Sequence, residues 1–409
     1  MRAVIRPGQA HGRVTVPGSK SAAHRLLIGA ALSDGTTEIL SCPDNEDIGA
    51  TADCLRALGV SVIRVGDAVT VTGIAPDESG ATRVLPCRAS GSTLRFLLPL
   101  ALTDGVPTCF TGVPRLFERP LSVYEDICRT RGIRWERETD RLTVCGRLTA
   151  GGYAVPGDVS SQFITGLLFA LPRLEGDSRI VLTTPSESRP YIDLSLDALD
   201  AFGVRVSRPD ENTFVIPGGQ RFTSPGRVRV PGDESAAAFF GALNALGGCV
   251  TIDGADPGSR QGDRVWRQLL GACVRGCPTI SLRDCPDLGP ILMVVGALMH
   301  GIRLTDTLRL RLKESDRGAV MAAELSKCGV DVLVSENGIV VPGGQVTPPR
   351  GTLDSHGDHR AAMALGVLCT VTGGTVTGAE CVGKSLPEFW RMLSDLGIGV
   401  ELLPDDVDL

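Results

Sequence analysis

Aromatic residues and long apolar runs are scarce in this chain of 409 residues. Phe, Trp and Tyr make up 4% of the sequence, against 43% for all hydrophobic residues, while Gly reaches 50 and Pro 26. No apolar run is long and clean enough to span a bilayer, and the first six residues are not typical of a signal peptide. We therefore expect a cytoplasmic protein with no membrane partner, many tight connections and closely packed helices.

Patterns typical of metal and nucleic-acid binding are also missing. The thirteen cysteines show no repeated C-x-x-C spacing, and the closest pair, Cys273 and Cys277, has no histidine nearby to complete a zinc site. An odd number of scattered cysteines fits reduced thiols in a cytosol. The net charge of −6 argues against a nucleic-acid surface. The sequence therefore predicts neither a metal site nor a nucleic-acid partner.

One signal recurs six times along the chain: an amphipathic stretch ends in a glycine, and a strand-like run follows. Such a glycine is typical of the residue just after a helix, which adopts a left-handed conformation. The intervals between these glycines are 73, 71, 68, 58 and 68 residues. The glycines are Gly59, Gly132, Gly203, Gly271, Gly329 and Gly397.

A second series of six segments is apolar nearly all round, which indicates buried helices. Polar residues gather at the front of each segment. Together the two series predict six units, each reading strand, buried helix, strand, amphipathic helix and two strands, and thus an α/β fold. The buried segments are 22–32, 93–102, 163–171, 236–246, 288–299 and 361–370.

A domain boundary is indicated by two near copies, 14–18 and 228–232, which lie 214 residues apart. If the chain leaves one domain at the first copy and returns at the second, each domain holds three units. We therefore expect a domain of residues 1–17 and 230–409 that bears both termini, and an inserted domain of residues 18–229. Hinges are expected near 17–18 and 230–232. Three helix N-termini per domain, aimed at a cleft between the domains, would attract anions.

The densest charged stretch, residues 311–317, holds five charges in seven residues and precedes a predicted helix. Lys313, Glu314 and Arg317 fall at i, i+1 and i+4, so that they can converge with the free N–H groups of the first turn. By itself the stretch equally fits a solvated helix start capped by Ser315 or Asp316. Only the rest of the chain favours an anion site.

Other helix starts carry similar chemistry. Residues 17–25 offer a lysine, hydroxyls and an arginine, which suit a phosphate or carboxylate cradle as well as a simple capped helix. His359 would ordinarily be a core histidine, but two charged neighbours favour a functional role. Cations also recur at comparable places before four amphipathic stretches. These are Arg119, Arg189, Lys313 and Lys384.

With these residues in place, the chain resembles the 5-enolpyruvylshikimate-3-phosphate (EPSP) synthase family of enolpyruvyl transferases over essentially its whole length. The resemblance implies two similar domains of three βαβαββ units each, with the active site in the cleft between them. Ten motifs in the right order carry it: PGSKSAAHR at 17–25, SGSTLR at 90–95, RLFERP at 115–120, DVSSQF at 158–163, SRPYID at 188–193, PGDESAA at 231–237, CPD at 285–287, RLKESDR at 311–317, GDHR at 357–360 and GKSLP at 383–387.

The resemblance further implies two sets of binding residues. Shikimate 3-phosphate would be bound mainly by the inserted domain, and phosphoenolpyruvate by the domain with the termini. The first set is Lys20, Ser21, Arg25, Ser160, Ser161, Gln162, Ser188, Tyr191, Asp287 and Lys313. The second set is Lys20, Gly91, Arg119, Gln162, Arg317, His359, Arg360 and Lys384. Two departures are Ala89 and Arg309, each in a place where family members have asparagine.

The implied reaction adds the 5-hydroxyl of shikimate 3-phosphate to phosphoenolpyruvate and releases phosphate, in aromatic amino-acid biosynthesis. Glu314 is the candidate acid that protonates the enol carbon, and Asp287 with Lys20 is the candidate for moving the hydroxyl proton. This chemistry requires no metal or organic cofactor. We expect a monomer whose only partners are these two substrates.

Three alternatives remain in competition. UDP-N-acetylglucosamine enolpyruvyl transferase shares the plan and the cosubstrate, but the serine-rich set at 160–162 and 188–191 does not suit a nucleotide sugar. A non-catalytic anion-binding protein would not need both Asp287 and Glu314. A solenoid that binds proteins would place its charged residues on one face rather than at helix starts.

Overall fold

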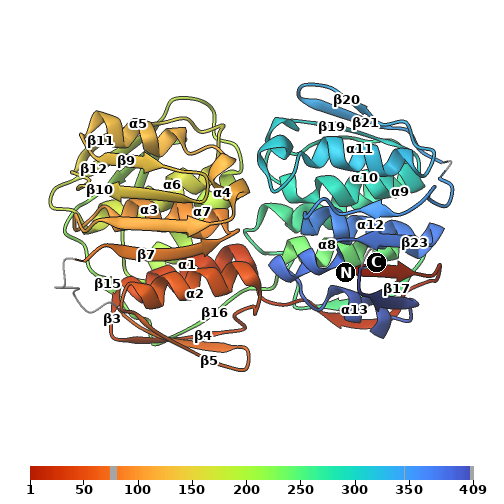
Figure 1. Ribbon diagram of the computed structural model, residues 1–409, viewed down its shortest axis with the longest axis horizontal. Helices are drawn as coiled ribbons and strands as arrows, with labels where there is room; N and C mark the ends of the chain where they lie inside the picture. The colour runs from red at the N-terminus through yellow and green to blue at the C-terminus, as the bar shows by residue number, and fades with distance from the viewer. Residues whose placement is uncertain (74–80, 345, 406–409) are drawn as a thin grey trace. The chain divides into compact units, whose positions relative to one another are not determined.

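The computed structural model describes residues 1–73, 81–344 and 346–405. The chain forms two compact units: one comprises Met1–Pro17 and Gly232–Leu409, and the other comprises Gly18–Pro231. We call them the terminal unit and the inserted unit. Figure 1 shows that both marked ends of the chain lie in the terminal unit. Each unit has its own hydrophobic core.

Five four-stranded sheets share one pairing pattern, in which the first two strands are parallel and the remaining pairs are antiparallel. In spatial order they are β16 (Arg227–Arg229), β4 (Thr36–Leu40), β6 (Ala68–Thr72) and β5 (Ser61–Val65); β7 (Arg83–Arg88), β8 (Thr108–Gly112), β10 (Arg141–Cys145) and β9 (Arg134–Arg137); β11 (Gly151–Val155), β12 (Ser178–Leu182), β14 (Thr213–Ile216) and β13 (Ser207–Asp210); β18 (Thr279–Ser281), β19 (Ile302–Thr305), β21 (Gly338–Val341) and β20 (Leu333–Val334); β22 (Leu353–Asp354), β23 (Gly374–Thr377), β1 (Arg2–Ile5) and β24 (Val400–Leu403).

The two near-copy segments supply the first strands of the first and fourth repeats. β16 pairs in parallel with β4, and β2 (His11–Thr15) pairs in parallel with β17 (Cys249–Asp253). Likewise, the N-terminal strand β1 completes the sheet of the last repeat. A further short pair joins β3 (Ser33–Asp34) to β15 (Phe222–Thr223). Strands far apart in sequence therefore close each unit.

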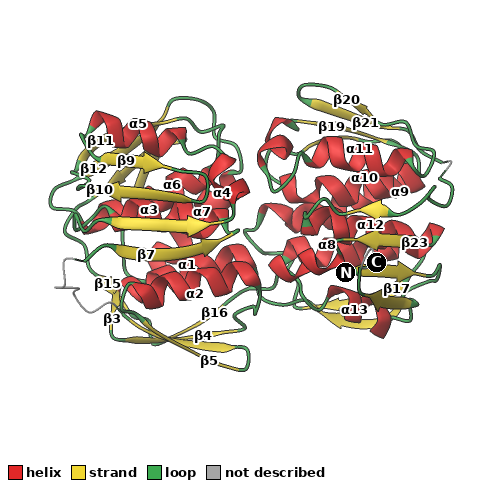
Figure 2. Cartoon of the chain, viewed as in Figure 1, coloured by secondary structure: helices red, strands yellow, loops and turns green. Residues whose placement is uncertain are grey.

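The six predicted buried helices are all present, so this prediction is confirmed. Their burial on nearly every side explains why their sequences are apolar all round. Figure 2 shows helices in the middle of each unit with strands around them. They are α1 (Lys20–Leu32), α3 (Gly91–Ala101), α6 (Ser161–Ala170), α8 (Glu234–Ala245), α10 (Gly289–Leu298) and α12 (His359–Thr372).

Six further helices match the predicted amphipathic stretches: α2 (Glu46–Ala57), α5 (Ser122–Thr130), α7 (Arg189–Ala201), α9 (Trp266–Arg275), α11 (Arg317–Ser326) and α13 (Phe389–Asp395). A short helix, α4 (Pro114–Glu118), precedes α5. Five of the six recurring glycines follow their helices with φ between +66° and +88°, as predicted. They are Gly59, Gly132, Gly203, Gly329 and Gly397.

The fourth repeat departs from the prediction. Gly271 lies inside α9, which continues to Arg275, and β18 of the fifth repeat follows directly. Among the described residues this repeat has only the parallel pair of β2 and β17, without a closing hairpin. The short interval of 58 residues between Gly271 and Gly329 was the sequence signal for this loss. Without a hairpin to enter, the helix has no need for a left-handed stop at Gly271.

Glycines inside the buried helices allow close packing. A Cβ atom on Gly166 of α6 would lie 2.4 Å from the backbone oxygen of Arg95 on α3 and 2.3 Å from the hydroxyl of Tyr124. Glycine therefore lets α3 and α6 approach closely enough to hold their N-terminal ends together. In the described part of the chain, no helix has the length and apolar character needed to cross a membrane.

His24, on α1, makes the stability of the fold depend on pH. It is buried, and its Nδ1 lies 2.8 Å from Oγ1 of Thr51. Burial lowers the pKa of His24 to about 3. Between that value and its usual pKa of about 6.5, the unfolded chain binds a proton that the folded chain does not, so acid favours unfolding.

We expect the free energy of unfolding to fall more steeply between pH 5.5 and 4.5 in the wild type than in His24→Gln. The difference should be about 1.4 kcal/mol per pH unit, measured by urea denaturation. The exposed His300 provides the control, because His300→Gln should keep the wild-type slope. Parallel curves for the wild type and His24→Gln would contradict the prediction.

Candidate active site

A buried arginine organises the charged stretch of the terminal unit. Arg317 is the first residue of α11 and is 1% exposed. Its Nε donates to Oδ2 of Asp358 at 2.9 Å, one terminal nitrogen donates to Oδ1 of Asp287 at 2.8 Å, and the other donates to Oε2 of Glu314 at 3.0 Å. Burial alone would lower the pKa of Arg317, but the three carboxylates raise it above its ordinary value. One fixed cation thus holds three acids in place.

Asp287 lies in η3 (Pro286–Leu288), directly before α10. Besides Arg317, it accepts from Nζ of Lys313 at 3.1 Å, and a guanidinium nitrogen of Arg360 lies 3.5 Å from its Oδ2. Burial by itself raises the pKa of Asp287, but Lys313, Arg317 and Arg360 together hold it well below the usual range. Asp287 is therefore a carboxylate surrounded by three cations, ready to accept a hydrogen bond.

Glu314 also lies between cations. Its Oε1 is 3.4 Å from Nζ of Lys384, and its Oε2 accepts from Arg317. Lys384 is the last residue of η5 (Ala379–Lys384) and is only 8% exposed. Burial lowers the pKa of Lys313, which Asp287 partly offsets. The structure thus brings Asp287, Lys313, Glu314, Arg317 and Lys384 into one connected cluster of the terminal unit.

The start of α12 joins this cluster. His359 and Arg360 are its first two residues, and both are buried. Nδ1 of His359 lies 4.0 Å from Oδ1 of Asp358, the same carboxylate that caps the helix by accepting from the backbone N–H of Arg360 at 2.9 Å. Asp358 therefore fixes both the start of α12 and the guanidinium of Arg317.

In the inserted unit, Lys20 opens α1 and pairs with a buried acid. Its Nζ lies 2.8 Å from Oδ2 of Asp47, which is 5% exposed and belongs to the first turn of α2. Ser19 caps α1, and Ser21 is the second residue of the helix. Asp47 thus holds the lysine side chain at the N-terminal end of α1, where the helix dipole adds to its positive charge.

The starts of α3 and α6 form a second cluster. Gly91 is the first residue of α3, and a Cβ atom there would lie 2.6 Å from a guanidinium nitrogen of Arg119 and 2.9 Å from one of Arg95. Arg95 donates to Oε1 of Gln162 at 2.8 Å, and Nε2 of Gln162 donates to Ser92 at 2.9 Å. The absence of a side chain on Gly91 therefore gives both guanidinium groups room beside the backbone.

Arg25, by contrast, is bound by its own protein. Its side chain donates to Ser195 at 2.8 Å, to the backbone oxygen of Tyr191 at 2.9 Å, to that of Ser21 at 2.5 Å and to Thr165 at 3.3 Å. It is 2% exposed, and burial lowers its pKa. Arg25 therefore ties α1 to α6 and α7 in this structure.

The predicted serines lie at helix starts. Ser160 caps α6 by accepting from the backbone N–H of Gln162 at 3.3 Å, and Ser161 begins the helix. Ser188, directly before α7, is buried with φ at +54°, a left-handed conformation that costs energy in a residue other than glycine. Such strain is typical of functional sites.

Sequence reasoning missed several residues that hold the candidates in place: Asp47, Arg95, Asp358 and Asp263. Burial raises the pKa of Asp263 to about 7, with the charge of nearby Asp287 adding to the effect, and Ser235 donates to its carboxylate. The signals available were acidic residues next to the motifs, as in GDHR and in Asn45-Glu46-Asp47. The two departures, Ala89 and Arg309, lie in the turn before α3 and in η4 (Leu308–Leu312).

Comparisons with known proteins agree over nearly the whole chain. The family described as EPSP synthase (3-phosphoshikimate 1-carboxyvinyltransferase) matches residues 4–393. Relatives named 3-phosphoshikimate 1-carboxyvinyltransferase from Clostridium kluyveri and Clostridium novyi are 40% and 38% identical. Each alignment covers 96% of this chain, and 96% and 97% of the respective relatives.

Solved structures give the same result. An EPSP synthase from Acinetobacter baumannii superposes with a TM-score of 0.73 at 25% identity, covering 98% of this chain and all of the other. The enolpyruvyl transferase NikO from Streptomyces tendae has a TM-score of 0.75 at 16% identity, over 98% of both chains, which is a likeness of fold. The repeats and sheets thus define an enolpyruvyl transferase fold. Within that class, the chain belongs to the EPSP synthase family.

The central place of Arg317 predicts a large loss of stability when it is removed. Arg317→Met would leave Asp287, Glu314 and Asp358 without their shared cation, and we expect the free energy of unfolding to fall by about 3–5 kcal/mol. Arg311, which is 41% exposed in its side chain, is the matched control, and Arg311→Met should cost less than about 1 kcal/mol. Urea denaturation measures both, and similar losses for the two variants would contradict the central role.

Proposed function

We propose that this protein transfers the enolpyruvyl group of phosphoenolpyruvate to the 5-hydroxyl of shikimate 3-phosphate and releases phosphate, in the shikimate pathway. The observation that carries the proposal is the cluster in which Asp287 and Glu314 lie among Lys313, Arg317 and Lys384, within a chain of the EPSP synthase family. Two acids among buried cations fit a reaction that moves protons between anionic substrates.

The proposed binding of shikimate 3-phosphate uses hydroxyl and amide groups at helix starts. The phosphate would lie against the N-terminal end of α6, where unpaired N–H groups and the helix dipole favour an anion. Asp287 and Lys313 would contact the ring hydroxyls. The proposed set is Lys20, Ser21, Arg25, Ser160, Ser161, Gln162, Ser188, Tyr191, Asp287 and Lys313.

The proposed binding of phosphoenolpyruvate relies on guanidinium and ammonium groups. Arginine forks can each bind a carboxylate or phosphate with two hydrogen bonds. Arg119, beside the bare backbone of Gly91, is the clearest case in the inserted unit. The proposed set is Lys20, Gly91, Arg119, Gln162, Arg317, His359, Arg360 and Lys384.

In the proposed mechanism, the oxygen of the 5-hydroxyl bonds to C2 of phosphoenolpyruvate while C3 gains a proton. Asp287 accepts the hydroxyl proton, with Lys20 assisting, and Glu314 donates the proton to C3. The tetrahedral adduct then breaks its C2–O bond to phosphate, and C3 returns a proton to Glu314 as the double bond re-forms. No net oxidation occurs, and no other reactant enters the balance.

The cations make this encounter possible. Both substrates carry phosphate or carboxylate groups, which repel each other when they are brought together. Lys384 and Arg317 bind Glu314 in the present structure, so that an anionic substrate would compete with Glu314 for the same cations. A carboxylate that loses cationic neighbours to a substrate binds a proton more readily. Substrate binding would thereby prepare Glu314 to act as an acid.

We further propose that the protein acts in the cytoplasm as a monomer. The reaction as written uses neither a metal ion nor an organic cofactor, and the two substrates are small anions. Each unit carries only part of the residues proposed above, so both units of the chain are needed for one turnover.

The direct test measures phosphate released from phosphoenolpyruvate by the purified full chain. We expect release that depends on shikimate 3-phosphate, yields the enolpyruvyl ether in equal amount, and is unchanged by EDTA. UDP-N-acetylglucosamine should not replace shikimate 3-phosphate. Release with UDP-N-acetylglucosamine alone would assign the protein to a different acceptor.

Glu314→Gln tests the proposed acid. The amide keeps the size and some hydrogen bonding of the side chain but cannot donate a proton, so kcat should fall by about 100-fold or more. Glu336→Gln, in the exposed turn between β20 and β21, is the control and should keep the wild-type kcat. A near-normal kcat for Glu314→Gln, with Asp287→Asn strongly impaired, would transfer the role of the acid away from Glu314.

A further inference from the structure

The inserted unit contains a cavity of about 430 Å³. It lies at the C-terminal ends of α1, α2 and α3, where Leu32, Leu58 and Ala101 line it. Lys20 is at the opposite end of α1, about 18 Å away at 1.5 Å per residue. The cavity is therefore distinct from the helix starts assigned above, and its volume falls in the range of small-molecule sites.

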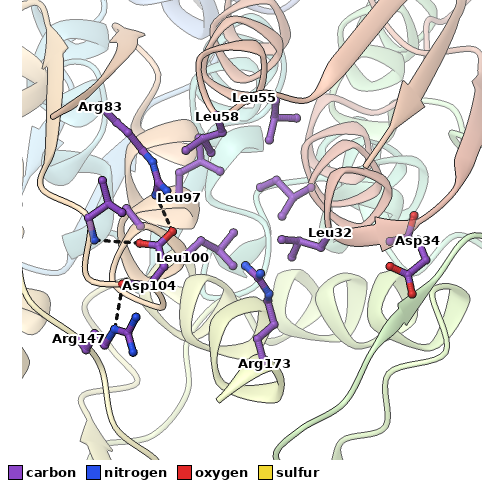
Figure 3. Close-up of a pocket in the computed structure, with 14 residues that line it drawn as sticks. Leu32, Asp34, Leu55, Leu58, Arg83, Leu97, Leu100, Asp104, Arg147 and Arg173 are labelled. Carbon is purple, nitrogen blue, oxygen red and sulfur yellow. Dashed lines mark hydrogen bonds and ion pairs between the residues drawn. The ribbon is translucent and has the colours of Figure 1, made fainter. Parts of the chain in front are cut away.

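Leucine side chains form most of the apolar lining. Leu32, Leu55, Leu58, Leu97 and Leu100 surround the cavity in Figure 3. Leu97 and Leu100 belong to the buried face of α3, whereas Leu32 and Leu58 are only partly covered by protein. This part of the wall offers an apolar group a place out of water.

Three arginines give the cavity its charge. Arg83 is already paired, since it donates to Oδ2 of Asp104 at 2.7 Å. Arg147 donates through Nε to the backbone oxygen of Asp104 at 2.9 Å, and its stem lies against Gly105. Its two terminal nitrogens have no hydrogen bond to the described residues. Arg147 therefore keeps donors available at the edge of the cavity.

Arg173 is the most informative of the three. Figure 3 shows its side chain pointing toward the space between Leu32 and Leu100. It makes no hydrogen bond or ion pair with the part of the chain that the structure describes. Desolvation lowers its pKa, with Arg83 adding to the effect and Asp104 opposing it only in part. An anion in the cavity would supply the negative charge that the protein does not.

The lining also limits the charge of a ligand. Three arginines and two acids, Asp34 and Asp104, leave a net charge of +1 (3 − 2). A single carboxylate matches this charge, and its planar geometry suits the guanidinium fork. An ammonium group would face Arg147 and Arg173 at unfavourable cost.

We propose that this cavity binds a small monocarboxylate with an apolar group, whose carboxylate contacts Arg173 and Arg147 and whose apolar group packs against Leu32, Leu58 and Leu100. The ligand class follows from the apolar wall, from the unpaired guanidinium of Arg173 and from the net charge of the lining. The proposal does not depend on the reaction that the protein catalyses.

The arginines have an alternative role that the test must separate. The cavity lies at the carbonyl ends of three helices, and cations near such ends stabilise them through the helix dipole. If that is their only role, Arg173→Gln should lower the melting temperature without changing the affinity for a carboxylate.

The probe is 3-phenylpropionate, titrated into the full chain and followed by ligand-observed NMR. We expect saturable binding with a Kd below about 1 mM. The neutral analogue 3-phenylpropan-1-ol should bind at least about tenfold more weakly, because it cannot accept the charge-assisted hydrogen bonds. Arg173→Gln should weaken binding of the carboxylate by about tenfold, and Arg147→Gln by a smaller factor.

Two controls locate the bound probe. Arg179→Gln, at an exposed position of β12 outside the lining, should leave the affinity unchanged. Lys20→Gln should also leave it unchanged, because a probe held at the helix starts would instead lose affinity there. Melting temperatures show whether each variant is folded. The proposal is overturned by absence of saturable binding up to about 10 mM, by equal affinity of the alcohol, or by unchanged affinity in both Arg173→Gln and Arg147→Gln.

Discussion

The terminal unit depends on one buried cation, the guanidinium of Arg317. A charge that is 1% exposed is tolerated only when acids surround it, and Asp287, Glu314 and Asp358 do so at hydrogen-bond distance. The same contacts fix the positions of the two acids to which we assign proton transfer. Structural stability and proposed chemistry therefore rest on a single set of hydrogen bonds, and no member can change without affecting the others.

The inserted unit follows a related rule with different side chains. Lys20 is held by Asp47, and Arg95 is held by Gln162, so that each cation at a helix start has a defined neighbour. Gly91 matters because it has no side chain, which leaves room for Arg119 beside the start of α3. In both units the start of a buried helix provides the backbone donors, and a long polar side chain from another helix or loop provides the charge.

The repeat also explains why function and packing occupy opposite ends of the same helices. Polar residues gather at the N-terminal ends, whereas the C-terminal ends of α1, α2 and α3 surround a leucine-lined cavity. The fourth repeat shows how far the unit can vary, since it keeps its parallel strands and two helices but lacks the closing hairpin among the described residues. The helices are the constant part of the repeat because they form the core.

The sequence by itself determined the six buried helices, five of the six glycine stops and the family. These features are local: apolar periodicity within one segment, a left-handed residue at a helix end, and motifs of adjacent residues. Only the tertiary structure decided that Asp47 holds Lys20, that Asp358 holds Arg317, and that Arg173 points into a cavity rather than into solvent. Those partners are separated by tens of residues or by whole helices, and a side chain's partner over such a distance depends on how the helices pack. The misplaced stop at Gly271 has the same cause, because whether a helix ends at a glycine depends on the strands that follow it.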